Sequence, residues 1–461
     1  MFSFLLLPLY THLLPEDEYG KVTIIFSYFI ILNVFLAYGM ETAFFRYYQD
    51  TDRQKKVVGT SALSLLFSSL FFVSIAWIFQ QPIADFIDLD ISYIQLVIAI
   101  LFLDALVIVP FAYLRAIQKP VKYAVIKISN VAINLGLNIY FLVYMYGTIS
   151  PDAWIYQIFD DQNQIHFIFL SNLIASAYTL LILIPFYFKI NYRFDFSLWK
   201  RMIRYGWPIL IAGVAYSINE TVDKILLDRM LPDTIARAQV GIYGACYKLA
   251  LFMTLFGTAF RLGIEPFFFS QAKEKNAATT YATITKYFVI LGSLILLGVV
   301  VFIDILKVFV VRNPSYWEGL IIVPIVLLAN FCLGIYHNLS VWYKVTDKTI
   351  YGAYISVAAA IITLILNVVL IPYISYIGSA IATLVAYSFM MVASWWIGKK
   401  YYPIPYEIKK IGIYFGLSIL FSGISFYLFN SNYWISIPLL VTFLLLLYFG
   451  ERKELIRIIK R

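Results

Sequence analysis

Two apolar stretches separated by five residues decide the fold: SYIQLVIAILFLDALVIVPFAYLR (Ser92–Arg115) and VKYAVIKISNVAINLGLNIYFLVYM (Val121–Met145). Each is long enough for an α-helix to cross the hydrocarbon core of a bilayer, which takes roughly 20 residues. The connection between them, AIQKP, is short and ends in proline, which is typical of a turn between helices. The stretch therefore predicts a pair of membrane-spanning helices.

The whole chain has the composition of a membrane protein. Of its 461 residues, 62% are hydrophobic, 18% aromatic and only 13% charged, whereas a soluble domain is about half apolar and a quarter charged. The alternation of outer-membrane strands does not occur in the apolar blocks. We predict an all-α, polytopic membrane protein of about fourteen transmembrane helices, at residues 1–14, 22–45, 57–80, 92–115, 121–145, 165–188, 206–228, 241–261, 286–306, 319–343, 350–372, 376–397, 411–429 and 433–450.

The first of these segments, Met1–Leu14, would reach only about 21 Å at 1.5 Å per residue, which is short of a full crossing. It has neither the basic beginning nor the small-residue cleavage site of a signal peptide. We expect a shortened first helix here.

The net charge of +9 has its simplest explanation in membrane topology and not in nucleic-acid binding. Lysine and arginine gather in alternate loops, for example from Arg46 to Lys56, from Arg115 to Lys127 and from Arg261 to Lys286, and in the C-terminal tail. The opposite loops hold only Lys21, Arg229, Arg237, Lys307 and Arg312. The positive-inside rule then predicts a multi-pass protein of the bacterial inner membrane with both termini in the cytoplasm.

The sequence favours a transporter over an enzyme. The two cysteines, Cys246 and Cys332, and the three histidines show no metal-ligand or catalytic spacing, and no phosphate-binding loop motif is present. The loops are short, whereas a membrane glycosyltransferase or polymerase would need a large external loop. We expect no catalytic residue, no metal and no cofactor, apart from a coupling H⁺ or Na⁺.

An internal repeat divides the chain. Arg115–Asn138 aligns without gaps on Lys344–Asn367, so that Arg115 matches Lys344 and Asn138 matches Asn367. A looser match pairs Glu41 with Glu265. Because each match joins spans six apart, we predict two pseudo-symmetric six-helix lobes at 1–190 and 191–400, followed at 401–461 by two extra helices and a basic tail. Parallel repeats of this kind are a transporter architecture; chance likeness of aromatic-rich spans is the alternative.

Ionisable residues at membrane depth are costly and therefore mark candidate functional positions. The seventh span carries Asn219, Glu220, Asp223 and Lys224, and Glu220 and Lys224 stand in the favourable i,i+4 order. Lys248 lies at a similar depth on the next span, about 10 Å from the outer face. We expect Lys224 and Lys248 to form a cationic patch; pairing of Lys224 with Asp223 or Glu220 is the alternative.

Further candidates lie at the inner ends and in the middle of the membrane. The inner ends hold Glu41 and Arg46 in one lobe and Arg261 and Glu265 in the other, where the positive-inside pattern alone also explains the arginines. Asp104 stands alone about 18 Å along the fourth span. It is our candidate for a coupling-ion or proton site, and a structural hydrogen bond between helices is the competing explanation.

Several segments resemble the polysaccharide-biosynthesis (O-antigen) flippase family of the multidrug/oligosaccharidyl-lipid/polysaccharide exporter superfamily. They are LLPEDEYGKVTI, YGMETAFFRYY, VGIYGACYKLALFM, EPFFFSQA and GIYHNLSVWYKVTDKTIYGAYI. The resemblance implies two lobes that open alternately to either side and flip an undecaprenyl-diphosphate-linked oligosaccharide from the cytoplasmic to the periplasmic leaflet. It implies that cavity cations bind the diphosphate, which we assign to Arg46, Lys224, Lys248 and Arg261. Membrane lipid, a glycan polymerase and glycosyltransferases are the expected partners, and no nucleic acid.

Other functions remain open at this point. A cation-coupled multidrug antiporter of the same superfamily is the nearest alternative, although it would favour an acidic cavity over the cations found here. A purely structural membrane scaffold does not require charges at membrane depth.

Overall fold

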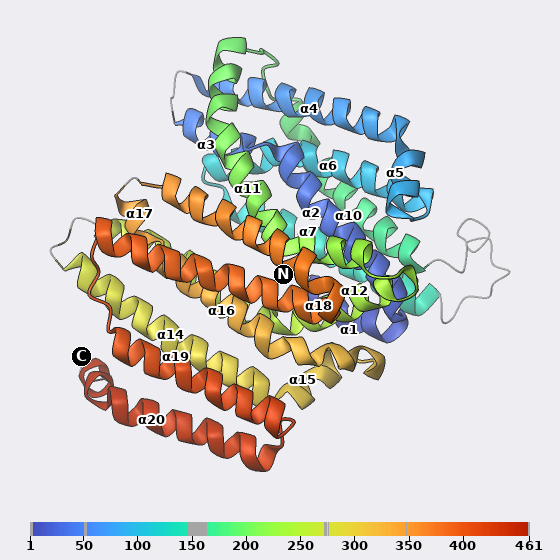
Figure 1. Cartoon of the computed structure of the whole chain (residues 1–461). Coiled ribbons are helices and arrows are strands. Elements are labelled where there is room, and N and C mark those ends of the chain that lie inside the picture. The colour runs from blue at the N-terminus through green and yellow to red at the C-terminus, as the bar shows by residue number, and fades with distance from the viewer. Residues whose placement is uncertain are drawn as a thin grey trace. The chain divides into compact units, whose positions relative to one another are not determined.

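The computed structural model describes residues 3–49, 53–145, 164–271, 274, 276–346 and 348–459. Within these residues the regular structure is entirely helical (Figure 1), which confirms the predicted all-α class. By chain contacts the protein divides into two compact units, Phe2–Ile225 and Leu226–Arg461 together with Met1. We call them the N-terminal unit and the C-terminal unit.

The N-terminal unit begins with short α1 (Ser3–Leu13), followed by α2 (Glu16–Ala37) and α3 (Met40–Tyr48). It continues through α4 (Gln54–Ile78), α5 (Gln80–Ile87), α6 (Ile91–Ala116), α7 (Pro120–Ile139), the π-helical turn Tyr140–Met145 and α10 (Gln164–Tyr187). Its centre is α6, which contacts α2, α3, α4, α5, α7 and α10. This central place explains why α6 is the most apolar stretch of the first half and is more than half buried.

The long helix α11 (Phe196–Met230) links the two units, and the division between them falls inside it. The C-terminal unit continues with α12 (Asp233–Tyr247), the 3₁₀ turn Lys248–Ala250, α13 (Leu251–Gln271), α14 (Ala277–Val301) and α15 (Ile303–Val310). A 3₁₀ segment (Pro314–Ile322) leads into α16 (Val323–Leu339) and α17 (Val341–Val345). The chain ends with α18 (Ile350–Tyr401), α19 (Ile408–Gly423), the π-helical turn Ile424–Leu428 and α20 (Tyr433–Ile459).

The 52-residue α18 is two antiparallel helices and not one rod. At the roughly 1.5 Å rise of an α-helix, the hydroxyls of Tyr351 and Tyr401 would be about 75 Å apart in a straight helix, yet they lie 2.6 Å from each other. The reversal occurs at Ile374 and Ser375, whose backbone angles are non-helical. The two halves correspond to the separate spans predicted at 350–372 and 376–397.

Eleven of the described helices are long and apolar enough to cross a membrane, so the predicted count of fourteen is not confirmed. α18 contributes one to that number although it contains two predicted spans. α1 is too short, as expected, and the charged α11 is not among the eleven. The predicted lobes at 1–190, 191–400 and 401–461 stay a prediction, since the compact units follow local contacts and divide at residue 225.

Candidate functional site

A break between α2 and α3 positions the first group of charged residues. α2 ends at Ala37, and after Tyr38 the residue Gly39 adopts a φ of +73°, a left-handed conformation that glycine adopts without strain. Gly206 of α11 lies against this turn, and a Cβ on Gly39 would stand only 2.5 Å from the Gly206 carbonyl oxygen. The two glycines therefore allow α11 to pack on the break, and α3, which follows it, carries Glu41 and Arg46.

Aromatic faces and one carboxylate hold the two arginines of this region. Arg115, at the end of α6, forms an ion pair with Glu41. Its guanidinium also lies 4.9 Å from the ring centre of Phe45 and 5.2 Å from that of Tyr123, and Arg46 lies 4.7 Å from the ring centre of Tyr205. Such cation–π contacts orient a guanidinium and leave its hydrogen-bond donors at the ring edge available. Sequence reasoning gave Arg115 only a topological role.

Deeper along α6, Asp104 accepts a hydrogen bond of 2.8 Å from the Ser176 hydroxyl of α10. Lys127 of α7 interacts electrostatically with both Asp104 and Arg115, and its ammonium lies 4.4 Å from the ring centre of Phe111. Glu41, Arg115, Lys127 and Asp104 thus form a line of charges that follows α6 for about 16 Å. The structure supplies the hydrogen bond that the competing explanation for Asp104 requires and also places a cation near it.

Asparagines continue this polar line along one face of α7. Lys127, Asn130, Asn134 and Asn138 follow at helical spacing. Asn130 donates to the Thr179 hydroxyl at 2.9 Å. Buried Asn138 donates to the Asn134 carbonyl at 2.8 Å and accepts the Tyr10 hydroxyl at 2.8 Å.

The repeat-related Asn367 makes the same two kinds of bond in the C-terminal unit. Its amide donates to the Thr363 carbonyl, four residues earlier, at 2.8 Å, and its oxygen accepts the Ser379 hydroxyl at 2.7 Å. The matched pair, Asn138 and Asn367, therefore has the same local role in each unit, which supports the internal repeat read from the sequence.

Two charged residues of α11, Asp223 and Lys224, are buried. The Lys224 ammonium lies 2.8 Å from Asp223 Oδ1 and 2.9 Å from the backbone carbonyl oxygen of Glu220. Asn219, on the same helix, is 4% exposed and Asp223 is 1% exposed. Lys224 therefore takes part in the pairing with Asp223 that the sequence offered as the alternative to a cationic patch.

The C-terminal unit holds the other predicted cations. Lys248 begins the 3₁₀ turn between α12 and α13 and is half-buried. Arg261 of α13 and Lys344 of α17 both interact electrostatically with His337 of α16, so that three basic side chains gather. Glu265 belongs to α13, but its side chain lies outside the described part of the structure.

A buried ion cluster in the same unit was missed by sequence reasoning. The charge pattern places Lys286 in a loop, which is wrong: it lies within α14 and is 1% exposed. Its ammonium lies 3.0 Å from Glu407 and 3.3 Å from Glu451 of α20, and the Tyr414 hydroxyl donates to Glu451 at 2.9 Å. Because α14 begins at Ala277 and not near 286, the threonine-rich turns before Lys286 are helical, and hydropathy does not detect them.

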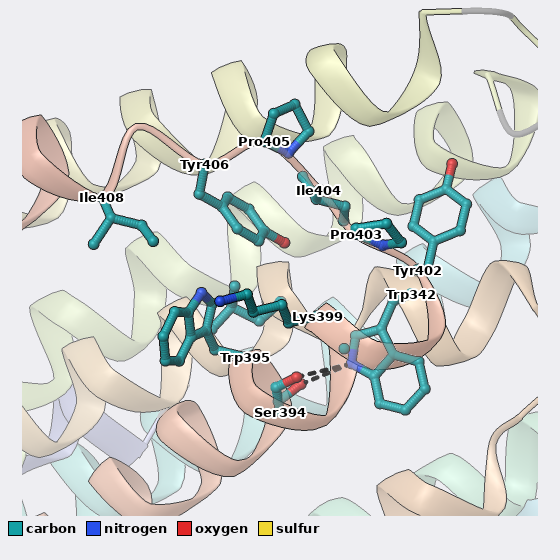
Figure 2. A pocket seen from close by; sticks show the side chains of 12 residues that line it. Trp342, Ser394, Trp395, Lys399, Tyr402, Pro403, Ile404, Pro405, Tyr406 and Ile408 are labelled. Carbon is teal, nitrogen blue, oxygen red and sulfur yellow. Dashed lines mark hydrogen bonds between the residues drawn. The ribbon is translucent and has the colours of Figure 1, made fainter.

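A small aromatic pocket lies beside the connection from α18 to α19. Figure 2 shows Trp342, Trp395, Tyr402 and Tyr406 around it, with Lys399 at its edge. Its volume is about 180 Å³, below the roughly 300 Å³ at which small-molecule sites begin. The Trp342 indole N–H donates to the Ser394 carbonyl at 3.1 Å. Its only hydrogen-bond donor is therefore already used, and the ring packs within the protein. Among the described residues, no group of three His, Cys, Asp or Glu side chains could hold a metal ion.

The fold resembles solved transporters. It matches the lipid II flippase MurJ in an inward closed conformation with a TM-score of 0.71 at 15% identity, over 98% of each chain. It matches an inward-facing multidrug resistance MATE family transporter of the MOP superfamily with a TM-score of 0.67 at 11% identity, over 90% of this chain and 94% of the other. The Vibrio cholerae MATE transporter VcmN gives a TM-score of 0.61 at 15% identity, over 90% and 94%.

At these identities the structural likeness shows the fold alone. Sequence evidence comes from a family described as polysaccharide biosynthesis protein, whose model matches residues 1–256, more than half of the chain. A search of curated proteins finds no significant match.

Proposed function

Because the chain belongs to the polysaccharide biosynthesis protein family, we propose that it is a flippase for an undecaprenyl-diphosphate-linked oligosaccharide. It moves an O-antigen, capsule or exopolysaccharide repeat unit from the cytoplasmic to the periplasmic leaflet of the bacterial inner membrane by alternating access. The multi-pass helical fold shared with transporters and flippases of the MOP superfamily supports this proposal over an enzyme.

One observation carries the choice of substrate: each unit holds two long cationic side chains around a repeat-related position. The N-terminal unit places Arg115, which is paired with Glu41, near Lys127, which also lies near Asp104. The C-terminal unit places Lys344 and Arg261 near His337. A diphosphate is the part of the substrate that is most expensive to take from water, and arginine and lysine donors are the groups that replace its hydration. Cations at matching positions of two repeats suit a transporter that must hold the same head group in each of its two states.

The roles of the individual residues follow from their surroundings. Arg46 and Arg115 are held by aromatic rings and are exposed, and the carboxylate that pairs with Arg115, Glu41, is itself accessible. Lys224 is buried and pairs with the buried Asp223 at 2.8 Å. We therefore assign Arg46, Arg115 and Arg261 to the diphosphate and give Lys224 and Lys248 a secondary role. Asp104 is assigned to coupling with H⁺ or Na⁺.

The test is a flipping assay with the purified full chain in vesicles that contain a fluorescent polyprenyl-diphosphate oligosaccharide. The double variant Arg46→Gln/Arg261→Gln should lower the flipping rate by about tenfold or more, since each charge-assisted contact is worth about 1.5–3 kcal/mol. Lys200→Gln removes an exposed cation of α11 and is the control, which should flip at the wild-type rate. Equal rates in the double variant and the wild type would contradict the proposal.

The likeness to MATE transporters favours a second function, a cation-coupled multidrug antiporter. Such a protein binds cationic drugs, for which the basic clusters of Arg115 and of Arg261 are unsuited. Gradient-driven uptake of a cationic dye by the vesicles, without flipping of the lipid, would favour the antiporter. We place both termini in the cytoplasm and expect a glycan polymerase and glycosyltransferases as partners of the flippase.

A further inference from the structure

A second basic site lies in the N-terminal unit, at the ends of α4, α6 and α10 where three connections meet. It is a cavity of about 590 Å³, which is within the roughly 300–1,000 Å³ of ligand sites. Four lysines line it and no carboxylate does: Lys55, Lys119, Lys122 and Lys189. All four are exposed, and the described part of the chain has no carboxylate in an ion pair with any of them.

The floor of the same cavity is apolar. Val58, Leu114 and Leu183 are buried there, and Tyr113 packs on Phe186 with ring centres 5.2 Å apart. An apolar floor beneath a cationic rim matches a molecule with an anionic head and a hydrocarbon chain. A soluble anion would use the rim and leave the floor in contact with water, which is unfavourable.

Two prolines shape this floor. Pro110 lies inside α6 and Pro185 inside α10, and both line the cavity. Because Pro110 has no N–H, the carbonyl of Leu106 loses its donor within the helix, and the Tyr187 hydroxyl of α10 donates to it instead. This bond ties α10 to α6 beside the cavity, so the floor does not depend on a ligand for its form.

The wall that carries Lys189 is also held in place. Gly59 of α4 lies directly under the backbone of Asn191, where a Cβ would overlap the Asn191 carbonyl. The Thr60 hydroxyl of α4 accepts from the backbone N–H of Asp195 at 3.1 Å. The loop after α10 therefore rests on α4, and its lysine lines the same cavity as the other three.

We propose that this cavity binds the phosphate head group of an anionic phospholipid, with an acyl chain on the apolar floor. The recognised chemistry is a phosphate monoanion or diester carried by a hydrocarbon chain, and basic pockets between membrane helices are known to suit such groups. None of the cations assigned to the diphosphate lines this cavity, and the binding of a bilayer lipid does not depend on the transport of a glycan.

The experiment uses the full chain in phosphatidylcholine nanodiscs with added phosphatidylglycerol, and counts the phosphatidylglycerol molecules retained per chain by native mass spectrometry. The variant Lys55→Gln/Lys119→Gln/Lys122→Gln/Lys189→Gln should bind the lipid about tenfold more weakly or worse. The matched control, Lys56→Gln/Lys200→Gln/Lys400→Gln/Lys409→Gln, removes four exposed lysines outside the cavity and should bind within about twofold of wild type. Equal retention in both variants would overturn the proposal, because it would mean non-specific attraction to the surface.

A second arm separates the two sources of phosphate. In pure phosphatidylcholine nanodiscs, glycerol phosphate, which carries the head-group phosphate without an acyl chain, should leave the thermal unfolding temperature of the chain unchanged, whereas phosphatidylglycerol should raise it. A rise of the same size with glycerol phosphate would overturn the lipid assignment. If the fourfold variant does not fold, Lys119→Gln/Lys122→Gln keeps two of the rim charges and should show an intermediate loss. No flipping is measured, so a failure here is distinct from a failure of the proposed transport.

Discussion

At the scale of single residues, Asp104 is where a proton or sodium role can be separated from a structural one. The Ser176 hydroxyl donates to its carboxylate at 2.8 Å, and Lys127 lies within electrostatic reach. An asparagine oxygen can accept the same hydrogen bond, so Asp104→Asn removes the charge and keeps the contact.

We therefore predict that Asp104→Asn folds normally and flips lipid at a rate that no longer responds to a proton or sodium gradient. The measurement is the flipping rate in vesicles with and without an imposed gradient of each ion. Ser176→Ala is the control, because it loses the hydrogen bond and keeps the carboxylate, and it should still respond. A full gradient response in Asp104→Asn would restrict Asp104 to the structural hydrogen bond.

Glu407 gives a prediction on pH. It lies just outside the span that begins at Ile408, and the hydrogen bond from Lys286 holds the pKa of its carboxyl below the usual value. A carboxyl whose pKa is lowered by folding stabilises the protein above its unfolded pKa, about 4.3, and loses that contribution as the pH falls through the folded value. The unfolding temperature in detergent should therefore drop more steeply below about pH 4.3 for wild type than for Glu407→Gln.

Lys286→Met checks the cause, since it removes the main donor to Glu407 and should make the same part of the curve less steep, while Lys410, 3.1 Å from Glu407, remains as a second donor. It should also lower the stability at neutral pH by about 1–3 kcal/mol, because Glu451 loses its buried cation and keeps only the Lys410 ammonium at 3.5 Å. Parallel curves of unfolding temperature against pH for wild type and Glu407→Gln would show that this carboxylate contributes nothing to the pH dependence of stability.

At the scale of elements, the reversal inside α18 depends on one residue in an uncommon conformation. Ser375 has φ +47° and ψ −135°, a combination that favours glycine at the first central position of a tight turn. Its hydroxyl donates to the Gln239 side chain at 2.9 Å. The hydrogen bond and the backbone strain act in opposite directions on the free energy of unfolding.

Ser375→Gly should therefore change the free energy of unfolding by less than about 1 kcal/mol, since relief of strain offsets the lost hydrogen bond. Ser375→Val loses the hydrogen bond and places a β-branched residue at positive φ, which should cost about 1–3 kcal/mol more. Thermal unfolding in detergent compares the two. Similar unfolding temperatures for both variants would mean that the turn is not strained.

The elements also show how far sequence reasoning reaches. Apolar runs predict most of the spans, because hydropathy records which residues meet lipid, and the Ser375 reversal lies where the interval between two predicted spans requires it. The ends of the helices are harder to predict from hydropathy. For example, α14 begins at Ala277, earlier than predicted, and Lys286 is therefore buried within it. The partner of Lys286 is Glu451, 165 residues away. No local pattern indicates that pairing, and the same applies to the contact of Glu41 with Arg115.

At the scale of the whole molecule, the ion pairs Lys224–Asp223 and Lys286–Glu451 share a feature with the repeat-related Asn138 and Asn367. Several buried charged and polar side chains have a partner in their own unit, such as Lys286 with Glu451 and Asn138 with Tyr10. These bonds stabilise the interior of each unit by itself, because both partners of each bond belong to the same unit.

The predicted orientation can be tested on the whole chain, because Cys246 and Cys332 are buried and should not react with a membrane-impermeant maleimide. Single cysteines at exposed positions then report the side of the membrane. Lys55→Cys and Lys400→Cys lie at basic helix ends and should be labelled only after the inner membrane is opened, whereas Gln81→Cys and Arg312→Cys should be labelled in cells with a permeable outer membrane alone. Labelling of Lys55→Cys and Gln81→Cys from the same side would mean that α4 does not cross the bilayer. The assignment of both termini to the cytoplasm by the positive-inside rule would then fail as well.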